Sequence, residues 1–256
     1  MRDETGWIEE IRALGGDFFL LKTRAPEISQ TACPGQFVMI QVSPTVVPLL
    51  RRPLGILRVK PPLLWLFFQV VGQGSAVLAG RRPGDALQIL GPLGKGFPDF
   101  RDKNVLLMAG GRGIVPLFFA AEKLRECNRV FLAYGGRQVS VLHMLDEIAE
   151  LKLQNVFLYT EDGSCGKRGL VSDETESLIA ENSIDTLCAC GPDAMLRTLA
   201  SRLRPLPIAA YFSFEALMAC GFGICHSCSL KGADGKYLKV CADGPVFRLE
   251  DVAWPI

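Results

Sequence analysis

The chain has 256 residues, 49% of them hydrophobic, and a formal net charge of +1. This length suits two modest domains with a small appendage, and the composition supplies a substantial core. Lys and Arg are scattered, which argues against nucleic-acid binding. No apolar signal segment follows Met1. Five of the nine cysteines show no framework spacing, which fits a reducing cytoplasm better than a disulfide scaffold: Cys33, Cys127, Cys165, Cys188 and Cys190. No segment is long and apolar enough to predict a membrane span.

The first 98 residues predict an antiparallel β-barrel. Short apolar runs recur at 18–21, 37–42, 55–59, 64–71 and 86–90, and turns containing Pro or Gly separate them. Evenly spaced short strands of this kind are typical of a small barrel. One helix is expected within this region, over 74–79.

Residues 99–205 predict a parallel α/β domain. The expected strands cover 104–108, 130–134, 156–160 and 186–189, and the expected helices cover 114–125, 141–151, 173–182 and 193–203. Such alternation indicates βαβ units. A Pro-containing break at 204–207 precedes a third, turn-rich module over 206–256, with a strand expected at 237–240. The fold class is therefore multi-domain, β followed by α/β, with a small C-terminal module.

Four cysteines near the end of the chain follow the pattern C-x4-C-x2-C-x12-C: Cys220, Cys225, Cys228 and Cys241. The first spacings are those of a plant-type 2Fe-2S cluster, whose fourth thiolate comes from further along the chain. Gly221 and Gly223 would let the backbone wrap such a cluster. The alternative is a zinc knuckle, although zinc sites favour two separated C-x2-C-like pairs.

Two loops of the α/β domain are candidates for nucleotide binding. Gly110, Gly111 and Gly113 lie between a strand and a helix, where glycine lets a pyrophosphate approach the backbone. Cys190, Gly191 and Pro192 end the last expected strand, so they should face the same crevice. The residues 161–164 offer carboxylates and hydroxyls that suit a ribose. The alternatives are tight turns with purely steric glycines, and a Cys190 that is simply a small buried side chain.

The barrel region holds two further candidates. The segment Arg52-Pro53-Leu54-Gly55 offers a guanidinium for a phosphate group. Residues 71–75, which include Gly74 and Ser75, offer backbone donors and a hydroxyl at the start of a helix. Either segment alone would fit an ordinary turn.

Taken in this order, the motifs resemble the ferredoxin-reductase-like flavoproteins, and within them the family of dihydroorotate dehydrogenase B electron-transfer subunits. The resemblance covers nearly the whole chain and rests on residues 52–54, 74–75, 91–97, 109–111, 162–164, 190–192, 215–221 and 240–247. It implies a six-stranded FAD barrel, an NAD domain, and cluster ligation by the four cysteines. It also implies FAD contacts at Arg52, Pro53, Leu54, Gly55, Phe67, Phe68, Gln69, Gly74 and Ser75.

The chain departs from that family's pattern at four positions. Gly55 stands where the family usually has Ser, which removes a hydroxyl near the flavin, and Ser75 stands where Thr is usual. Arg112 and Phe222 stand where smaller or aliphatic side chains are usual.

The resemblance also implies a function. A partner FMN-containing catalytic subunit would oxidise dihydroorotate to orotate, with two of each subunit in the assembly. The 2Fe-2S cluster and FAD of this chain would then pass electrons between that subunit and NAD+/NADH in de novo pyrimidine (UMP) biosynthesis. No catalytic acid or base is expected in this chain, and no nucleic-acid or membrane partner. The catalytic subunit is expected near Phe222, Ile224 and His226.

Two alternatives remain open at this stage. One is the FAD/2Fe-2S subunit of a ferredoxin:NAD(P)H or sulfide-type oxidoreductase, or of a hydrogenase. The other is a non-enzymatic redox-sensing or zinc-stabilised module, against which the coincidence of several separate site elements argues.

Overall fold

The computed structural model describes residues 1–45 and 47–254, and the chain divides into two compact units. The first unit contains Met1–Gly96, Glu215–Ser229 and Lys239–Pro245, and the second contains Phe97–Phe214, Leu230–Leu238 and the chain from Val246 onward. The segments that carry the four cysteines therefore belong to the same unit as the N-terminal barrel. The boundaries 1–98, 99–205 and 206–256 stay a prediction.

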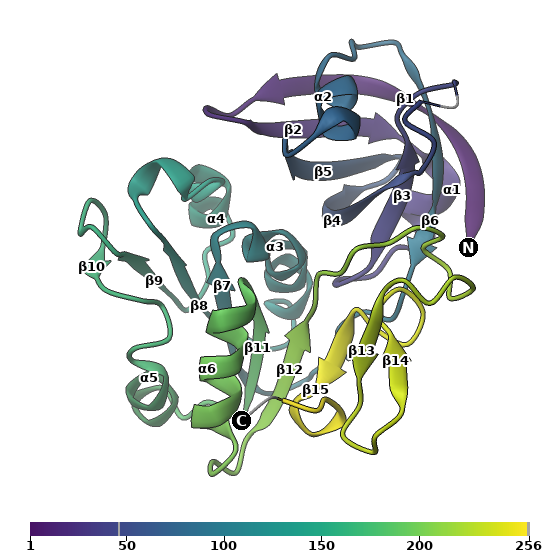
Figure 1. The fold of residues 1–256 in the computed structure, drawn as a ribbon. Helices are drawn as coiled ribbons and strands as arrows, with labels where there is room; N and C mark the ends of the chain where they lie inside the picture. Colours follow the sequence, from purple (N-terminus) through teal and green to yellow (C-terminus); the bar gives the residue numbers. More distant parts are fainter. Residues whose placement is uncertain (46, 255–256) are drawn as a thin grey trace. The chain divides into compact units, whose positions relative to one another are not determined.

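The first unit is built on a closed barrel with the strand order β1-β2-β5-β4-β3-β6 (Figure 1). All its neighbouring strands are antiparallel, which confirms the six-stranded antiparallel barrel. Side chains alternate along β6, where Leu87 and Ile89 are buried and Ala86 and Gln88 are exposed. Period-two burial of this kind gives the barrel an apolar interior. The strands are β1 (Arg2–Ala13), β2 (Phe18–Arg24), β3 (Phe37–Gln41), β4 (Arg52–Lys60), β5 (Leu63–Gln69) and β6 (Ala86–Leu93).

Two short helices accompany the barrel strands. The expected helix is present as α2 (Gln73–Ala79), which is capped because the Ser75 hydroxyl accepts the N–H of Gly72 at 3.2 Å. Helix α1 (Pro26–Thr31) was not expected. It is too short to show a helical periodicity, and it begins with Pro26, whose missing N–H costs little at a helix start. A carboxylate from distant β1, that of Glu4, accepts the N–H groups of its first turn.

The second unit is built on a seven-stranded sheet with the order β10-β9-β8-β7-β11-β12-β15. Its strands are parallel except β15, so the predicted parallel α/β domain is confirmed. Strands β10, β12 and β15 were not expected. β10 and β15 have only two and three residues, and β12 is defined by its pairing with β11 rather than by a long apolar run. The strands are β7 (Asn104–Gly110), β8 (Arg129–Gly136), β9 (Asn155–Thr160), β10 (Lys167–Arg168), β11 (Thr186–Cys190), β12 (Ala209–Ser213) and β15 (Val246–Arg248).

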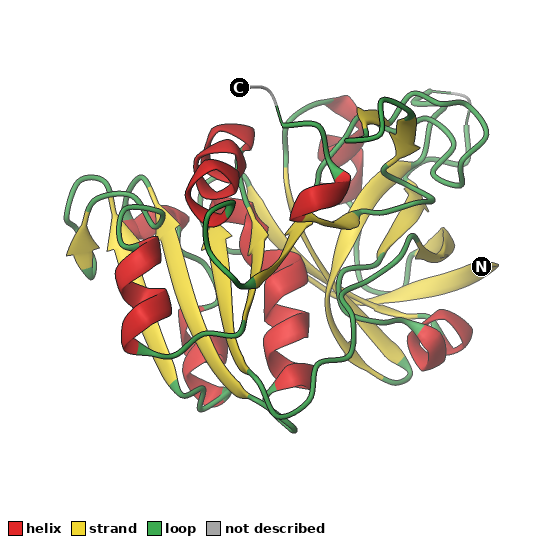
Figure 2. Ribbon diagram, turned by 90° about the horizontal axis from the view of Figure 1, so that it is seen from below, coloured by secondary structure: helices red, strands yellow, loops and turns green. Residues whose placement is uncertain are grey.

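Helices lie on both faces of this sheet (Figure 2). The chain runs from β7 to β8 and β9, and then crosses back to β11 and β12, so right-handed connections place the helices before β9 on one face of the sheet and those after it on the other. The change of direction falls between β7 and β11, which is where open α/β sheets bind ligands. The helices are α3 (Ile114–Leu124), α4 (Leu145–Glu150), α5 (Thr175–Glu181) and α6 (Asp193–Leu203), with 3-10 turns at Gly111–Gly113, Val139–Val141 and Leu249–Asp251.

One expected helix is shorter in the structure. The sequence predicts a helix over 141–151, whereas the structure has a 3-10 turn ending at Val141 and a helix that begins at Leu145. Met144 adopts a left-handed backbone with φ of 65°, which interrupts a right-handed helix. Its side chain is buried, so tertiary packing overrides the local propensity here.

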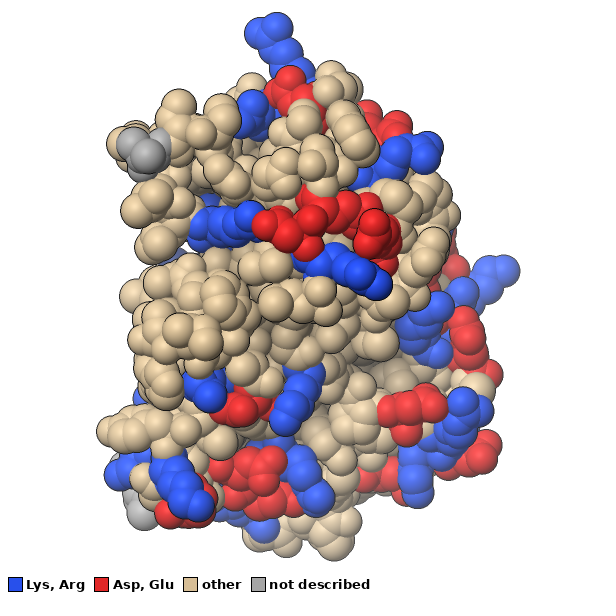
Figure 3. All heavy atoms as spheres, turned by 90° about the vertical axis from the view of Figure 1, so that its right-hand side faces the viewer, with Lys and Arg blue, Asp and Glu red and all other residues tan. Residues whose placement is uncertain are grey.

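The remaining strands form a two-stranded sheet, β13 (Ser229–Lys231) with β14 (Tyr237–Lys239), and confirm the strand expected near 237–240. Among the helices in the described part of the chain, none combines the length and apolar character needed to cross a bilayer. Acidic and basic side chains are intermixed on the face shown in Figure 3. That face therefore offers no broad basic surface of the kind that nucleic-acid binding uses.

Candidate functional site

The two predicted nucleotide loops meet in the second unit. Strands β7 and β11 are hydrogen-bonded neighbours, and Ala109 is paired with Cys190 at their carboxyl ends. The glycine loop begins immediately after Ala109, and the Cys190-Gly191-Pro192 loop leaves the sheet beside it. The structure thus brings together two segments that are about 80 residues apart, at the point where open α/β sheets bind ligands.

Close packing leaves no room for a side chain at three of the four glycines in these loops. A side chain at Gly110 would meet Met195 Sδ at 2.6 Å, and one at Gly191 would meet the same sulfur at 2.7 Å. A side chain at Gly113 would overlap the carbonyl group of Cys190. Gly111 differs, since it has a φ of 51° and open space around it. Open space beside a 3-10 turn that leads into α3 fits the approach of a pyrophosphate.

The loop after β9 lies at the same edge of the sheet. The N–H of Glu161 donates to Gly136 at the end of β8, and the Ser164 hydroxyl accepts the N–H of Val139. Ser164 also donates to the carboxylate of Asp162 through its hydroxyl at 2.6 Å and its N–H at 2.9 Å, and these bonds lower the pKa of Asp162. An ionised carboxylate and a hydroxyl at this edge suit the hydroxyl groups of a ribose.

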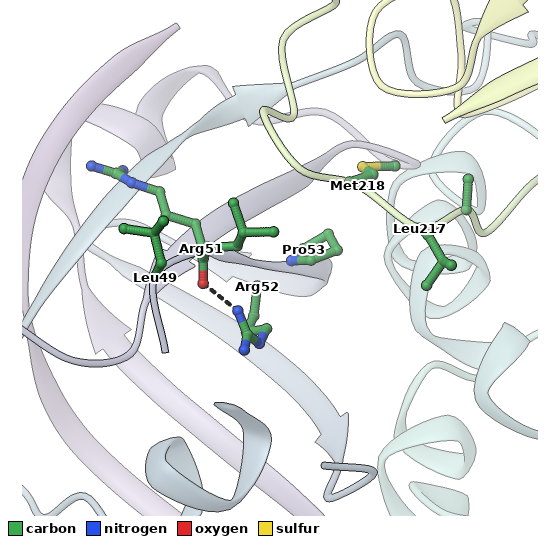
Figure 4. A pocket seen from close by; sticks show the side chains of 8 residues that line it. Leu49, Arg51, Arg52, Pro53, Leu217 and Met218 are labelled. Atoms are coloured by element: carbon green, nitrogen blue, oxygen red, sulfur yellow. Dashed lines mark hydrogen bonds between the residues drawn. The ribbon is translucent and has the colours of Figure 1, made fainter. Parts of the chain in front are cut away.

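In the first unit, the structure joins two of the predicted FAD segments. The guanidinium of Arg52, at the start of β4, lies over Gly74 in α2 so closely that a side chain at position 74 would overlap it. Arg52 also donates to the carbonyl of Leu50 (Figure 4). Pro53, Leu54 and Gly55 continue β4, paired with β3. A guanidinium held beside the first turn of a helix fits the recognition of a phosphate.

The other residues predicted to contact FAD have a structural role as well. The rings of Phe67 and Phe68 are buried in the barrel wall, where they stack on Phe18 and Phe19 with centroids 5.6 Å and 5.5 Å apart. A cofactor could therefore reach only their main chain. Ser75 uses its hydroxyl to cap α2. Assignment of all these residues to FAD stays a prediction.

A pocket of about 400 Å³ lies next to Arg52 in the first unit. The residues around it are Leu49, Leu50, Arg51, Arg52, Pro53, Ala216, Leu217 and Met218. Figure 4 shows Arg52 and Pro53 on one side of it and Leu217 and Met218 on the other. The sequence did not single out the pocket. Its two walls come from segments more than 160 residues apart, and only folding reveals that they adjoin.

The cysteine-rich segment packs on the barrel. Gly221 has a φ of 81°, and a side chain there would meet Met39 of β3 at 2.5 Å. Gly223 has a φ of 90°. Both therefore take a left-handed backbone, which glycine adopts without steric cost. Farther along, the N–H of Lys95 donates to the carbonyl of Gly244, three residues after Cys241.

The four cysteines come together as two pairs. The N–H of Cys225 points to the sulfur of Cys220 at 3.5 Å, and the N–H of Cys241 points to that of Cys228 at 3.4 Å. Within each pair the thiols also interact directly. Within residues 1–45 and 47–254, no three His, Cys, Asp or Glu side chains converge as one metal ion would require. Two pairs fit a two-iron cluster, in which each iron takes two thiolates, better than a single tetrahedral zinc.

The two pairs differ in environment. Cys228 and Cys241 are buried, whereas Cys225 is exposed. The hydroxyl of Ser227, the Ser227 N–H and the Cys220 N–H lower the pKa of Cys225 to about 6. Burial raises the pKa of Cys241 to about 12. A thiol that already favours the thiolate suits ligation of iron, whereas Cys241 would have to lose its proton to bind a metal.

The comparisons with known proteins agree with this arrangement. The model of the iron-sulfur cluster binding domain of dihydroorotate dehydrogenase B matches residues 215–253, and that of the oxidoreductase NAD-binding domain matches residues 107–201. The dihydroorotate dehydrogenase B (NAD(+)) electron transfer subunit homolog of Aquifex aeolicus is 36% identical, over 93% of this chain and 94% of that one. The electron transfer subunit of Geobacillus kaustophilus is 39% identical, over 86% of each.

Solved structures show the same architecture. The structure described as an NADH-dependent reduced ferredoxin-NADP oxidoreductase matches with a TM-score of 0.87 and 31% identity, over 98% of this chain and 90% of that one. The ferredoxin reductase in carbazole 1,9a-dioxygenase matches with a TM-score of 0.68 and 22% identity, over 81% of this chain and 66% of that one, and shows the fold alone.

An antiparallel barrel, a parallel nucleotide-binding sheet and an iron-sulfur segment define a ferredoxin-reductase-like oxidoreductase component that uses FAD, NAD and a 2Fe-2S cluster. Within that class, the chain belongs to the family of dihydroorotate dehydrogenase B electron transfer subunits. The resemblance stated from the motifs is therefore confirmed. The other oxidoreductases and the zinc-stabilised module are not favoured.

Proposed function

We propose that this chain is the electron-transfer subunit of a dihydroorotate dehydrogenase B. It passes electrons between an FMN-containing catalytic subunit, which oxidises dihydroorotate, and NAD+ in pyrimidine biosynthesis. The family membership and the two matching domains support this function. The assembly would contain two copies of each subunit. We place it in the cytoplasm, where the five cysteines outside the proposed cluster would stay reduced.

One structural observation carries the proposal. The pocket beside Arg52 is lined both by predicted FAD contacts and by the segment 216–218, which leads directly into Cys220. Residues that would hold a flavin and residues that would hold the cluster are thus neighbours within one unit. When bound, FAD exchanges a hydride with NAD+/NADH while the cluster carries single electrons, so FAD links the two.

The chain's own residues bind and orient the cofactors. Arg52 supplies a positive charge for an FAD phosphate, and β4 supplies the adjoining main chain through Pro53, Leu54 and Gly55. The main chain of Phe67, Phe68 and Gln69 and the start of α2 at Gly74 and Ser75 complete this set. In the second unit, Gly110, Gly111, Gly113, Cys190, Gly191 and Pro192 form the NAD loops. The hydride transferred to NAD+ would combine two single electrons with one proton that water can supply, so we assign no catalytic acid or base among the side chains.

Cys220, Cys225, Cys228 and Cys241 are the proposed ligands of the 2Fe-2S cluster. Leu217, Phe222 and Ile224 lie in the same segment and are exposed, with 90% of Leu217 accessible. Three exposed apolar side chains beside the ligands suit a protein partner that covers them. We therefore expect the catalytic subunit to dock at this segment.

The test is reconstitution with the FMN-containing subunit. Cys225→Ser should abolish dihydroorotate-dependent NADH formation by the complex, while NADH still bleaches the bound FAD. Cys33→Ser is the matched control, because it removes an exposed thiol of the same unit that lies outside the cysteine cluster. Retention of full activity by Cys225→Ser would overturn the ligand assignment. Failure of the unaltered chain to couple with an FMN-containing dehydrogenase would overturn the function.

A further inference from the structure

Ser227, a serine beside the proposed cluster ligands, has a side chain that contacts one of those ligands. Ser227 lies between Cys225 and Cys228, and its hydroxyl oxygen is 3.2 Å from the sulfur of Cys225. The same oxygen accepts the N–H of Ala219 at 3.1 Å. The carbonyl of Leu217 is 3.5 Å away. The main-chain N–H of Ala219 therefore fixes the position of the Ser227 hydroxyl oxygen.

The direction of the hydroxyl proton follows from these three contacts. The Ala219 N–H occupies a lone pair of the oxygen, so the proton points to another partner. The Leu217 carbonyl, at 3.5 Å, is beyond the usual range for an O–H···O bond. A cysteine that ligates iron is a thiolate and has no proton to donate, so Ser227 must be the donor in that pair. A charged acceptor also attracts the proton more strongly than a neutral carbonyl does.

We propose that the Ser227 hydroxyl donates a hydrogen bond to the Cys225 thiolate and thereby raises the reduction potential of the 2Fe-2S cluster. This inference rests on the proposed function, since it assumes that the cluster is present. The reduced cluster carries one more negative charge than the oxidised one, and part of that charge lies on the thiolate sulfurs. A donor to sulfur therefore stabilises the reduced form more than the oxidised form.

The contact is specific to the side chain at position 227. The bonds from Cys225 to the Cys220 sulfur and from Cys241 to the Cys228 sulfur use main-chain N–H groups, which almost any residue would supply. The bond from Ser227 needs a hydroxyl. It also acts on Cys225, which is exposed, so it acts at the accessible side of the proposed site. Ser227 is thus a positioning residue that tunes the centre through its ligand.

The experiment is a redox titration of the full chain, purified anaerobically with FAD and cluster and followed by electron paramagnetic resonance. Ser227→Ala should make reduction of the cluster less favourable by up to about tenfold, or about 59 mV for one electron. Ser227→Thr keeps the hydroxyl and should retain the original potential. Ser229→Ala is the matched control, because Ser229 is two residues away at the start of β13 and its hydroxyl donates to the carbonyl of His226 instead of to a cysteine sulfur. It should leave the potential unchanged.

A second readout separates tuning from a structural role. The iron–thiolate stretching bands in the resonance Raman spectrum should shift to higher frequency in Ser227→Ala, and should not shift in Ser227→Thr or Ser229→Ala. An unchanged potential in Ser227→Ala, or an equal shift in Ser229→Ala, would overturn the inference. Loss of the cluster from Ser227→Ala would also overturn it, because the hydroxyl would then serve the loop fold. If the unaltered chain holds no 2Fe-2S cluster, the proposed function itself fails.

Discussion

Replacement of Gly74 by alanine should separate the binding of FAD from the stability of the barrel. Gly74 is buried in α2, and a methyl group there would overlap the guanidinium of Arg52. The overlapping atoms are the end of a flexible side chain, so Arg52 can swing away without a shift of β4. Gly74→Ala therefore displaces the charge that we assign to an FAD phosphate and leaves the backbone in place.

Two separate energies set the expected changes in folding stability and in FAD affinity. Alanine is favoured over glycine within a helix by about 0.5–1 kcal/mol, so the free energy of unfolding of the apoprotein should stay the same or rise. A hydrogen bond to a charged group contributes about 1.5–3 kcal/mol. Its loss should raise the Kd for FAD by roughly 10- to 150-fold. The variant should thus be as stable as the original protein and bind FAD much less well.

The assay is a titration of apoprotein with FAD, followed by flavin fluorescence, together with urea unfolding of the same samples. Gly80→Ala is the matched control at the end of the same helix, since a side chain there meets only main-chain oxygens at 3.7 Å. Arg52→Ala should weaken FAD binding to a similar extent, and the double variant should add little. Normal FAD affinity in Gly74→Ala, or a loss of stability with intact affinity, would refute the assignment of Arg52.

Two other predictions concern the NAD loops and the pH dependence of stability. Gly113→Ala should weaken NADH binding and lower the free energy of unfolding by about 1–3 kcal/mol, because the new methyl would overlap the rigid carbonyl of Cys190. The new methyl of Gly111→Ala would meet open space, so the free energy of unfolding should fall by only about 1–2 kcal/mol, because the backbone there is left-handed. NADH titrations should show a smaller change for this variant than for Gly113→Ala. Equal effects in both variants would contradict the packing argument. The hydrogen bond from Lys22 lowers the pKa of Glu10 in the folded protein below its usual value of 4.5. The ion pair therefore stabilises the fold above pH 4.5, and this stabilisation is lost as the pH falls through the lowered pKa of Glu10. Glu10→Gln should therefore lower the Tm at pH 7 and lose less stability than the original protein under acid; parallel Tm curves would show that the pair contributes nothing.

The sequence by itself determined the types of element and most of the chemistry. Apolar runs with Pro- and Gly-containing turns predicted the barrel, and alternating strands and helices predicted the parallel sheet, because both patterns are local. The cysteine spacing predicted a cluster for the same reason, since three of the four thiols lie within nine residues. Helix α6 has the predicted bounds because its apolar side chains recur at helical spacing.

Only the tertiary structure decided which distant segments meet. Strand β15 and helix α1 depend on contacts with β12 and with Glu4, so no local pattern reveals them. The overlap between Gly74 and Arg52 and the pocket wall at Leu217 join segments far apart in the chain. The grouping of the cysteines into pairs and the donor to Cys225 depend on side-chain directions. Sequence spacing states which residues can be close, whereas packing of the folded backbone decides which atoms make contact.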